Sequence, residues 1–212
     1  MIAIIDYGLS NLLSIQRAVS IFDEDYCVTS SRDAVRSSDR IILPGVGAFG
    51  YGMDRLDKLG LSVAIREKAE EGTPILGICL GMQMLLDKSE EGGSYAGLGL
   101  IKGVVSRIPD SDIDNNRQDV PHIGWERLEI NNRYEGKYDI FKHCDSIGEA
   151  YFIHSYEAVV EKEENLVSTV VYGGRKIAAI IQKDGIVGCQ FHPEKSAEFG
   201  LDLIKAFITD FR

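Results

Sequence analysis

A cysteine flanked by two glycines is the first feature of the chain that could do chemistry. Cys79 lies between Gly77 and Gly81, directly after the apolar run 74–76, so we predict a strand that turns sharply into a helix there. Small flanking residues leave room for a strained backbone at such a turn. A thiol at the start of a helix lies near the positive end of the helix dipole, which favours the nucleophilic thiolate. Cys79 is therefore the candidate nucleophile.

A histidine and a carboxylate near the C-terminus could complete a nucleophilic site. His192 and Glu194 belong to one His-Pro-Glu segment, and in extended backbone their side chains share a face. Nucleophilic catalysis needs a base within hydrogen-bond reach and a third group that orients the base. The distance from Cys79 along the sequence does not argue against the pairing, because such groups meet in space. The alternative interpretation of Cys79 is a buried structural thiol.

The composition is typical of a soluble globular protein and excludes several classes of function. The chain has 212 residues without a linker-like segment, which predicts a single domain over 1–212. A net charge of -10 argues against broad binding of nucleic acid or anionic membranes. No signal peptide or membrane span is visible, so we predict a cytoplasmic protein. The cysteines form no close pair and no zinc-ligand spacing is present, so we expect no metal and no cofactor.

Strands and helices alternate in the N-terminal half. Apolar runs at 2–6, 40–43 and 75–79 predict strands, and helical spacing of apolar residues predicts helices after residue 11 and over 49–59 and 61–71. Such alternation indicates an α/β fold with a mostly parallel central sheet, flanking helices, and ligands at the carboxyl ends of the strands. The strand at 2–6 is expected to end before Tyr7, and the strand at 40–43 before Pro44.

The C-terminal half has strand-like runs instead, which predict an added antiparallel β section. They lie at 101–108, 125–130, 150–160, 166–172 and 177–182. Asp184 and Gly185 indicate a hairpin turn, and the return strand 186–191 would deliver His192 to a strand end. A final helix is predicted over 197–211.

Six segments together resemble the class I, triad-type glutamine amidotransferases. They are Ile-Asp-Tyr-Gly at 5–8, Leu-Pro-Gly-Val-Gly-Ala-Phe at 43–49, Gly-Ile-Cys-Leu-Gly-Met-Gln at 77–83, Pro-His-Ile-Gly-Trp at 121–125, His-Ser-Tyr at 154–156 and Gln-Phe-His-Pro-Glu-Lys-Ser at 190–196. Within that class the chain looks like the glutaminase subunits of imidazole glycerol phosphate synthase, nearly from end to end. The resemblance implies the class I glutamine amidotransferase fold.

The resemblance also implies a mechanism and the residues that carry it. Cys79 would attack the side-chain amide of L-glutamine, His192 would act as base and acid, and Glu194 would orient His192. Donors to the tetrahedral intermediate would come from Leu80 and from the loop Gly45, Val46 and Gly47. We hypothesise that the loop's donor is badly aimed until a partner binds. The residues implied in substrate binding are Gln83, Glu91, His154, Ser155 and Tyr156.

By the same resemblance the partner is a (β/α)8 barrel cyclase. The two subunits would form a heterodimer, in which ammonia passes to the cyclase for making imidazole glycerol phosphate and AICAR in histidine biosynthesis. Asn11, Trp125 and Lys195 match interface positions. Trp125 could instead be a core residue, and Lys195 a solvated charge.

One position departs from the family pattern. Ser10 stands where the family usually has glycine, and a serine would be strained there if the turn needs a positive φ. Because Ser10 lies beside the expected partner face, two alternatives stay open. One is a related glutaminase that feeds ammonia to an amidotransferase acting on surface sugars. The other is a catalytically silent, glutaminase-like regulatory module.

Overall fold

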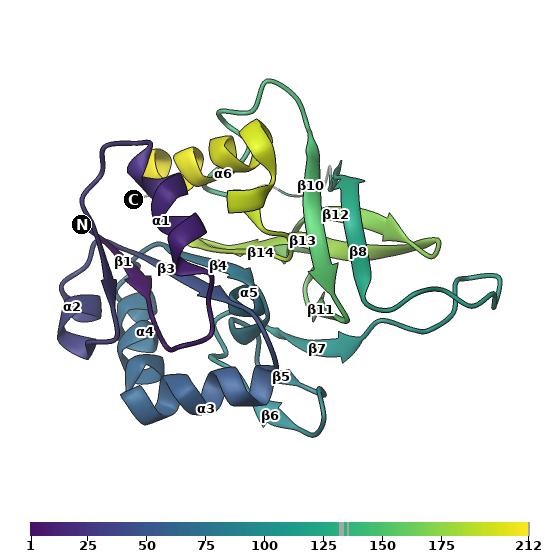
Figure 1. The fold of residues 1–212 in the computed structure, drawn as a ribbon, viewed down its shortest axis with the longest axis horizontal. Helices are drawn as coiled ribbons and strands as arrows, with labels where there is room; N and C mark the ends of the chain where they lie inside the picture. The colour runs from purple at the N-terminus through teal and green to yellow at the C-terminus, as the bar shows by residue number, and fades with distance from the viewer. Residues whose placement is uncertain (132–133, 135, 212) are drawn as a thin grey trace.

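A central β-sheet organises the chain (Figure 1). The structure is a computed structural model that describes residues 1–131, 134 and 136–211. Within these residues the central sheet has eight strands in the order β2-β1-β3-β4-β14-β13-β12-β9. Their bounds are β1 Ile2–Ile5, β2 Tyr26–Thr29, β3 Arg40–Gly45, β4 Ile75–Cys79, β9 Glu129–Ile130, β12 Leu166–Tyr172, β13 Arg175–Lys183 and β14 Ile186–Cys189.

One half of the central sheet is parallel. β1 pairs with β2 and β3, β3 pairs with β4, and β4 pairs with β14, all in parallel. Every residue of β1 and β4 is buried, because helices cover both faces of this part of the sheet. Successive side chains of β1 point to opposite faces, so Ile2 and Ile4 pack in one apolar cluster and Ala3 and Ile5 pack in the other.

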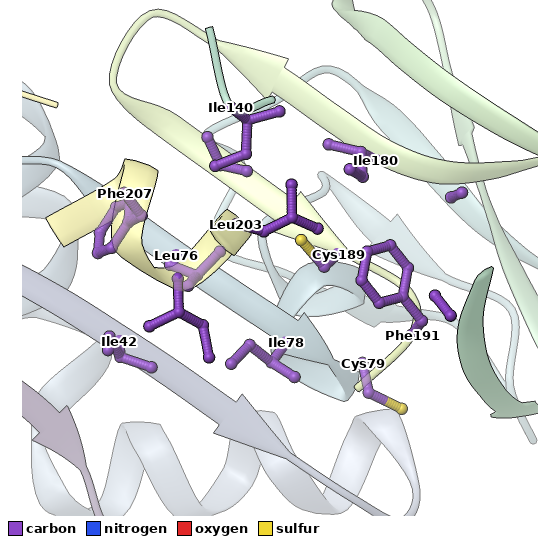
Figure 2. Packing of buried hydrophobic residues seen from close by; sticks show 14 of the residues in the cluster. Ile42, Leu76, Ile78, Cys79, Ile140, Ile180, Cys189, Phe191, Leu203 and Phe207 are labelled. Carbon is purple, nitrogen blue, oxygen red and sulfur yellow. The ribbon is translucent and has the colours of Figure 1, made fainter. Parts of the chain in front are cut away.

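The helices divide between these two clusters. α1 (Leu12–Ser20) and α6 (Ala197–Asp210) cover one face, whereas α2 (Arg32–Arg36), α3 (Phe49–Leu59), α4 (Leu61–Glu70) and α5 (Leu80–Met84) cover the other (Figure 1). Leu203 and Phe207 of α6 belong to the same cluster as Leu76 and Ile78 of β4, and Cys79 stands at the margin of that cluster (Figure 2). The nucleophile candidate is thus held at the end of the best-buried strands.

The C-terminal half adds antiparallel strands, so the predicted α/β architecture is confirmed. β13 turns through Asp184 and Gly185 into β14 and pairs with it in antiparallel fashion. Two smaller sheets lie beside the central one. The first joins β10 (Glu149–His154) to β8 (His122–Arg127), and the second holds β11 (Tyr156–Val160), β7 (Gly103–Arg107), β5 (Lys88–Ser89) and β6 (Tyr95–Ala96). Short 3-10 turns are η1 (Glu163–Asn165) and η2 (Pro193–Lys195).

Several element boundaries differ from the sequence-based prediction. β3 does not stop before Pro44 but continues to Gly45, paired with β4. Its pairing with β1 ends at Ile42, so Pro44 has a neighbouring strand on one side only and its missing N–H breaks no ladder. The run 150–160 splits at Ser155 into β10 and β11, which belong to different sheets, and β2 and α2 were not predicted.

Candidate active site

The backbone at Cys79 forms the predicted sharp turn between β4 and α5. Cys79 has φ +54° and ψ -111°, a conformation that costs an L-residue roughly 1–3 kcal/mol. A Cβ atom at Gly77 would lie 2.7 Å from the carbonyl oxygen of Gly81, and a Cβ atom at Gly81 would lie 1.7 Å from the carbonyl oxygen of Leu43. Both glycines are therefore required by close backbone approach, as the sequence predicted.

His192 follows β14 and is fixed by hydrogen bonds from both its ring and its backbone. Its Nδ1 lies 2.9 Å from Oε1 of Glu194, and both side chains are buried. The backbone N–H of His192 donates to the Tyr151 carbonyl at 3.1 Å, and the Ser196 hydroxyl donates to the His192 carbonyl at 2.7 Å. With Nδ1 bound to Glu194, the other ring nitrogen is left for Cys79.

Electrostatics pairs this histidine with the thiol. Burial favours neutral His192, but its interactions with Cys79 and with Glu194 outweigh burial and raise the pKa of His192 to about 9. A raised pKa favours an imidazolium beside a thiolate, which is the reactive form of a Cys–His pair. The arrangement can both hold a thiolate and deliver a proton to a leaving group.

A cavity of about 350 Å³ opens over Cys79 and His192. Most of the predicted site residues line it, together with Pro121 and Ile153: Val46, Gly47, Cys79, Leu80, Gln83, Glu91, His154, Ser155, Tyr156 and His192. Glu194 and Gly45 do not line it, because Glu194 lies behind the His192 ring and Gly45 is still part of β3. The residues predicted from five separate segments thus meet in space.

The first N–H of the loop after β3 is bound to a main-chain carbonyl and not offered to the cavity. Val46 donates its backbone N–H to the carbonyl of Leu9 at 2.8 Å. Gly47 has φ +103°, and a Cβ atom there would meet nothing within 4 Å. Glu91 accepts a hydrogen bond from the backbone N–H of Phe49 at 2.7 Å, so its carboxylate also caps the first turn of α3.

A buried network of amides and imidazoles backs the cavity, and the sequence did not reveal it. The carbonyl of Tyr156 accepts from Nε2 of Gln83 at 3.1 Å and contacts Nδ1 of His154 at 2.9 Å. Nε2 of Gln83 also donates to Oε1 of Gln190 at 3.0 Å. Nε2 of His154 lies 3.1 Å from Nδ1 of His122. The recurrence of Gln and His in the motifs was the available signal, but their pairing depends on segments that are distant in sequence.

The two buried histidines of this network are uncharged near neutral pH. Burial lowers the pKa of His154 to about 4, against the opposing hydrogen bond to the Tyr156 carbonyl. Burial also lowers the pKa of His122, against the opposing contact with Glu126. His122 is stacked between Phe152 and Tyr172, with ring centroids at 5.3 and 4.1 Å. His122 therefore packs against aromatic rings of the interior, and His154 lines the cavity.

The residues predicted to face a partner are exposed and lie beside the catalytic segment. Trp125 is 50% exposed, which contradicts the alternative that it is a core residue. Asn11 and Lys195 are also exposed, and Trp125 and Lys195 line a second hollow that is bordered by Glu194 and by α1. Ser10 is not among the residues with positive φ, so the serine is not strained there.

Two negative findings concern the described residues. Among them, no group of three or more His, Cys, Asp or Glu side chains could hold a metal ion. No helix in that part of the chain is long and apolar enough to cross a membrane.

The fold and this site point to one class of protein. Residues 3–211 match the family model described as glutamine amidotransferase class-I. Among solved structures, PurLQS from Thermotoga maritima superposes with a TM-score of 0.70 at 21% identity, covering 100% of this chain and 98% of that chain. A putative GMP synthase protein from Thermoplasma acidophilum gives 0.68 at 18% identity, covering 98% and 91%. At these identities the solved structures show the shared fold alone.

Curated relatives are closer in sequence. Imidazole glycerol phosphate synthase subunit HisH 1 from Legionella pneumophila (strain Lens) is 42% identical over 208 residues, covering 98% of each chain. The HisH subunit from Moorella thermoacetica is 43% identical over 206 residues, covering 97% of this chain and 93% of its own. The chain therefore belongs to the class-I glutamine amidotransferases and, within them, to the HisH subunits of imidazole glycerol phosphate synthase.

Proposed function

We propose that this chain is a glutaminase that hydrolyses L-glutamine to glutamate and ammonia and passes the ammonia to a cyclase subunit in histidine biosynthesis. The observation that carries the proposal is the meeting of Cys79 and His192 in one cavity at the ends of β4 and β14. The full-length similarity to HisH subunits supports the same interpretation. We also propose that the protein works in the cytoplasm, as the sequence predicts.

The chemistry assigns one task to each catalytic group. The Cys79 thiolate attacks the side-chain amide carbon of glutamine and forms a tetrahedral intermediate. His192 donates a proton to the amide nitrogen as the carbon–nitrogen bond breaks, so ammonia leaves and a thioester remains. His192 then takes a proton from water, which attacks the thioester and releases glutamate and the free thiol. Glu194 holds the imidazole in the orientation that both steps need.

Binding of glutamine is assigned to the polar wall of the cavity. Glu91 offers a carboxylate to the α-amino group, and Gln83 offers its side-chain oxygen, because both amide hydrogens of Gln83 are already used. His154, Ser155 and Tyr156 form the opposite side, at the passage from β10 to β11. A pocket built of such groups rejects molecules that leave them unpaired.

The oxyanion donors are proposed as the N–H of Leu80 and one N–H of the loop Gly45, Val46 and Gly47. Stabilising the intermediate requires donors that already point at the developing charge. The Val46 N–H is bound to Leu9 instead, so the loop must exchange that bond before it can serve. We assign this exchange to docking of the partner, since Leu9 directly precedes Ser10 and the exposed Asn11.

The partner is proposed as the cyclase with a (β/α)8 barrel, bound as a heterodimer. The names of the relatives describe one subunit of a synthase. Asn11, Trp125 and Lys195 are the candidate contacts, and all three are exposed on the side of the molecule that carries η2 and α1.

Glutamate release measured alone and with the cyclase tests chemistry and partner together. The protein is assayed by itself, with the cyclase, and with the cyclase and its nucleotide substrate. We expect slow hydrolysis alone and a strong rise with the liganded cyclase. Cys79→Ala should abolish the activity, whereas Cys189→Ala, which removes another buried thiol, should retain it.

Each other outcome selects an alternative. Hydrolysis that ignores the cyclase would favour the glutaminase that feeds a surface-sugar amidotransferase. Absence of hydrolysis under every condition, with no thioester trapped on Cys79 by a glutamine-like electrophile, would favour the silent regulatory module.

A further inference from the structure

A fully buried glutamine lies next to the catalytic sulfur, and none of the roles assigned above uses it. Gln190 is 0% exposed, and only Phe191 separates it from the His-Pro-Glu segment. Its Nε2 lies 3.9 Å from Sγ of Cys79, and its Oε1 accepts the hydrogen bond from Gln83. An amide group has a donor end and an acceptor end, so its effect on the sulfur depends on which end faces Cys79.

The network behind the cavity fixes that orientation. The carbonyl oxygen of Tyr156 can only accept hydrogen bonds, so the end of Gln83 that faces it must be the NH2 group. The second hydrogen of that NH2 group points at Gln190, which must therefore present its oxygen there. Turning either amide would bring two donors or two acceptors to hydrogen-bond distance and leave buried polar groups unpaired.

The histidines hold the other side of the same carbonyl. Nδ1 of His154 must carry a hydrogen, because it faces the accepting Tyr156 carbonyl at 2.9 Å. In the neutral ring Nε2 is then an acceptor, and it faces Nδ1 of His122 at 3.1 Å. The Tyr156 carbonyl thus receives two donors, one from each side, and it cannot swing away from Gln83 without leaving a buried donor unpaired.

We propose that Gln190 is a catalytic hydrogen-bond donor, whose side-chain NH2 group stabilises the thiolate of Cys79 and is aimed at the sulfur through Gln83 by the Tyr156 carbonyl. A donor turned toward Sγ favours the ionised over the neutral thiol, because the thiolate is the stronger acceptor. Gln190 therefore acts from the protein interior, while His192 supplies the proton. This assignment rests on the proposed role of Cys79 as nucleophile.

The test is the pH dependence of Cys79 alkylation, read on the Cys79 peptide by mass spectrometry. Gln190→Met keeps the side-chain length and removes the donor. We expect the midpoint of the alkylation profile to rise by roughly 0.5–1 pH unit, which is the shift that the net contribution of one ordinary hydrogen bond produces. The kcat/KM for glutamine hydrolysis should fall about three- to tenfold below the midpoint and recover above it. A merely structural loss would not recover with pH.

Gln182→Met is the matched control. Gln182 is also buried and lies on the neighbouring strand β13. Its Nε2 donates to the carbonyls of Tyr138 and Asp184, and neither of these residues lines the cavity. The control should lose stability and keep both the alkylation midpoint and the pH profile. An unchanged midpoint in Gln190→Met, or an equal rise in Gln182→Met, would overturn the proposal.

Two further measurements keep the result decisive. Gln190→Glu retains an oxygen for Gln83 and replaces the donor by a charge, so it should raise the midpoint more than Gln190→Met does. If neither variant folds, one side-chain amide proton of Gln190 in the unaltered protein should move downfield as the thiol ionises, and no such shift would reject the assignment. Because alkylation needs no glutamine, its outcome is separate from that of the glutaminase assay.

Discussion

The two walls of the catalytic cavity are built by different physical means. On the β4 side, main-chain geometry places Cys79, the proposed nucleophile, because Gly77 and Gly81 let backbone atoms approach more closely than any side chain would allow. On the β14 side, side-chain hydrogen bonds with Glu194 and Gln190 place His192, the proposed base, and Gln83 of the proposed substrate wall. Close backbone packing fixes the side chains on one wall, and buried hydrogen bonds fix them on the other. Substitutions in the first wall should therefore mainly lower folding stability, and substitutions in the second should mainly lower activity.

Removing the steric room on the nucleophile wall should have the largest effect. Gly81→Ala would place a Cβ atom 1.7 Å from a backbone oxygen that cannot move aside. We expect a loss of folding stability above about 3 kcal/mol, measured by denaturant unfolding. Gly124→Ala, where the nearest atom is 3.9 Å from the added Cβ, is the control. Equal stability of the two variants would contradict steric placement.

On the polar wall, loss of activity should exceed loss of stability. His192→Ala should lower kcat for glutamine hydrolysis by about 10²- to 10⁴-fold, because the group that transfers protons is gone. Glu194→Ala should cost less, on the order of 10- to 10²-fold, since orientation is partly recovered when the base remains. Steady-state kinetics with the cyclase checks the order. A Glu194 variant that is as damaged as the His192 variant would show that orientation and proton transfer cannot be separated.

The polar wall should also make stability depend on pH. The pKa of His154 is lowered by burial from 6.5 to about 4, so the unfolded chain binds the extra proton between these values. Stability should therefore be fully present above pH 6.5 and fall as pH drops toward 4, by on the order of 3 kcal/mol for this residue. Denaturant unfolding at several pH values measures the slope. His154→Gln should flatten it relative to the unaltered protein, and an identical slope in both would count against the assignment.

The smallest effect is expected from strain at the nucleophile itself. Cys79→Gly should be more stable than Cys79→Ala by about 1 kcal/mol, because glycine adopts φ +54° without the penalty of a Cβ atom. Both variants lack the thiol, so the difference in their thermal unfolding midpoints isolates the backbone. If alanine is the more stable, the turn at Cys79 is not strained.

The two walls also differ in how much of them the sequence could predict. The turn on the β4 side was predictable because its cause is local. The glycines around Cys79 and the apolar run before it are enough to predict a strand that turns sharply into a helix. The polar wall was predictable only where one motif holds both partners, as in His192 and Glu194. The pairing of Gln83 with Gln190 spans 107 residues and depends on how α5 meets the end of β14, so no local pattern carries it.

The fold shows the same division. The parallel half followed from alternating apolar runs and helical spacing, whereas the break at Ser155 was missed because no glycine or proline marks the point where the chain changes sheets. β2 escaped prediction because it is a half-buried edge strand of four residues, too short to show a period.

The hydrogen bond from Val46 to Leu9 joins two main-chain groups. Every amino acid except proline carries the donor, and every amino acid carries the acceptor, so substitution of either side chain leaves the bond available. A contact of this kind persists when the side chains around it change, including that of Ser10, which follows Leu9 directly. Substitutions at this turn can therefore change the surface offered to a partner without removing the main-chain contact that we propose opens on docking.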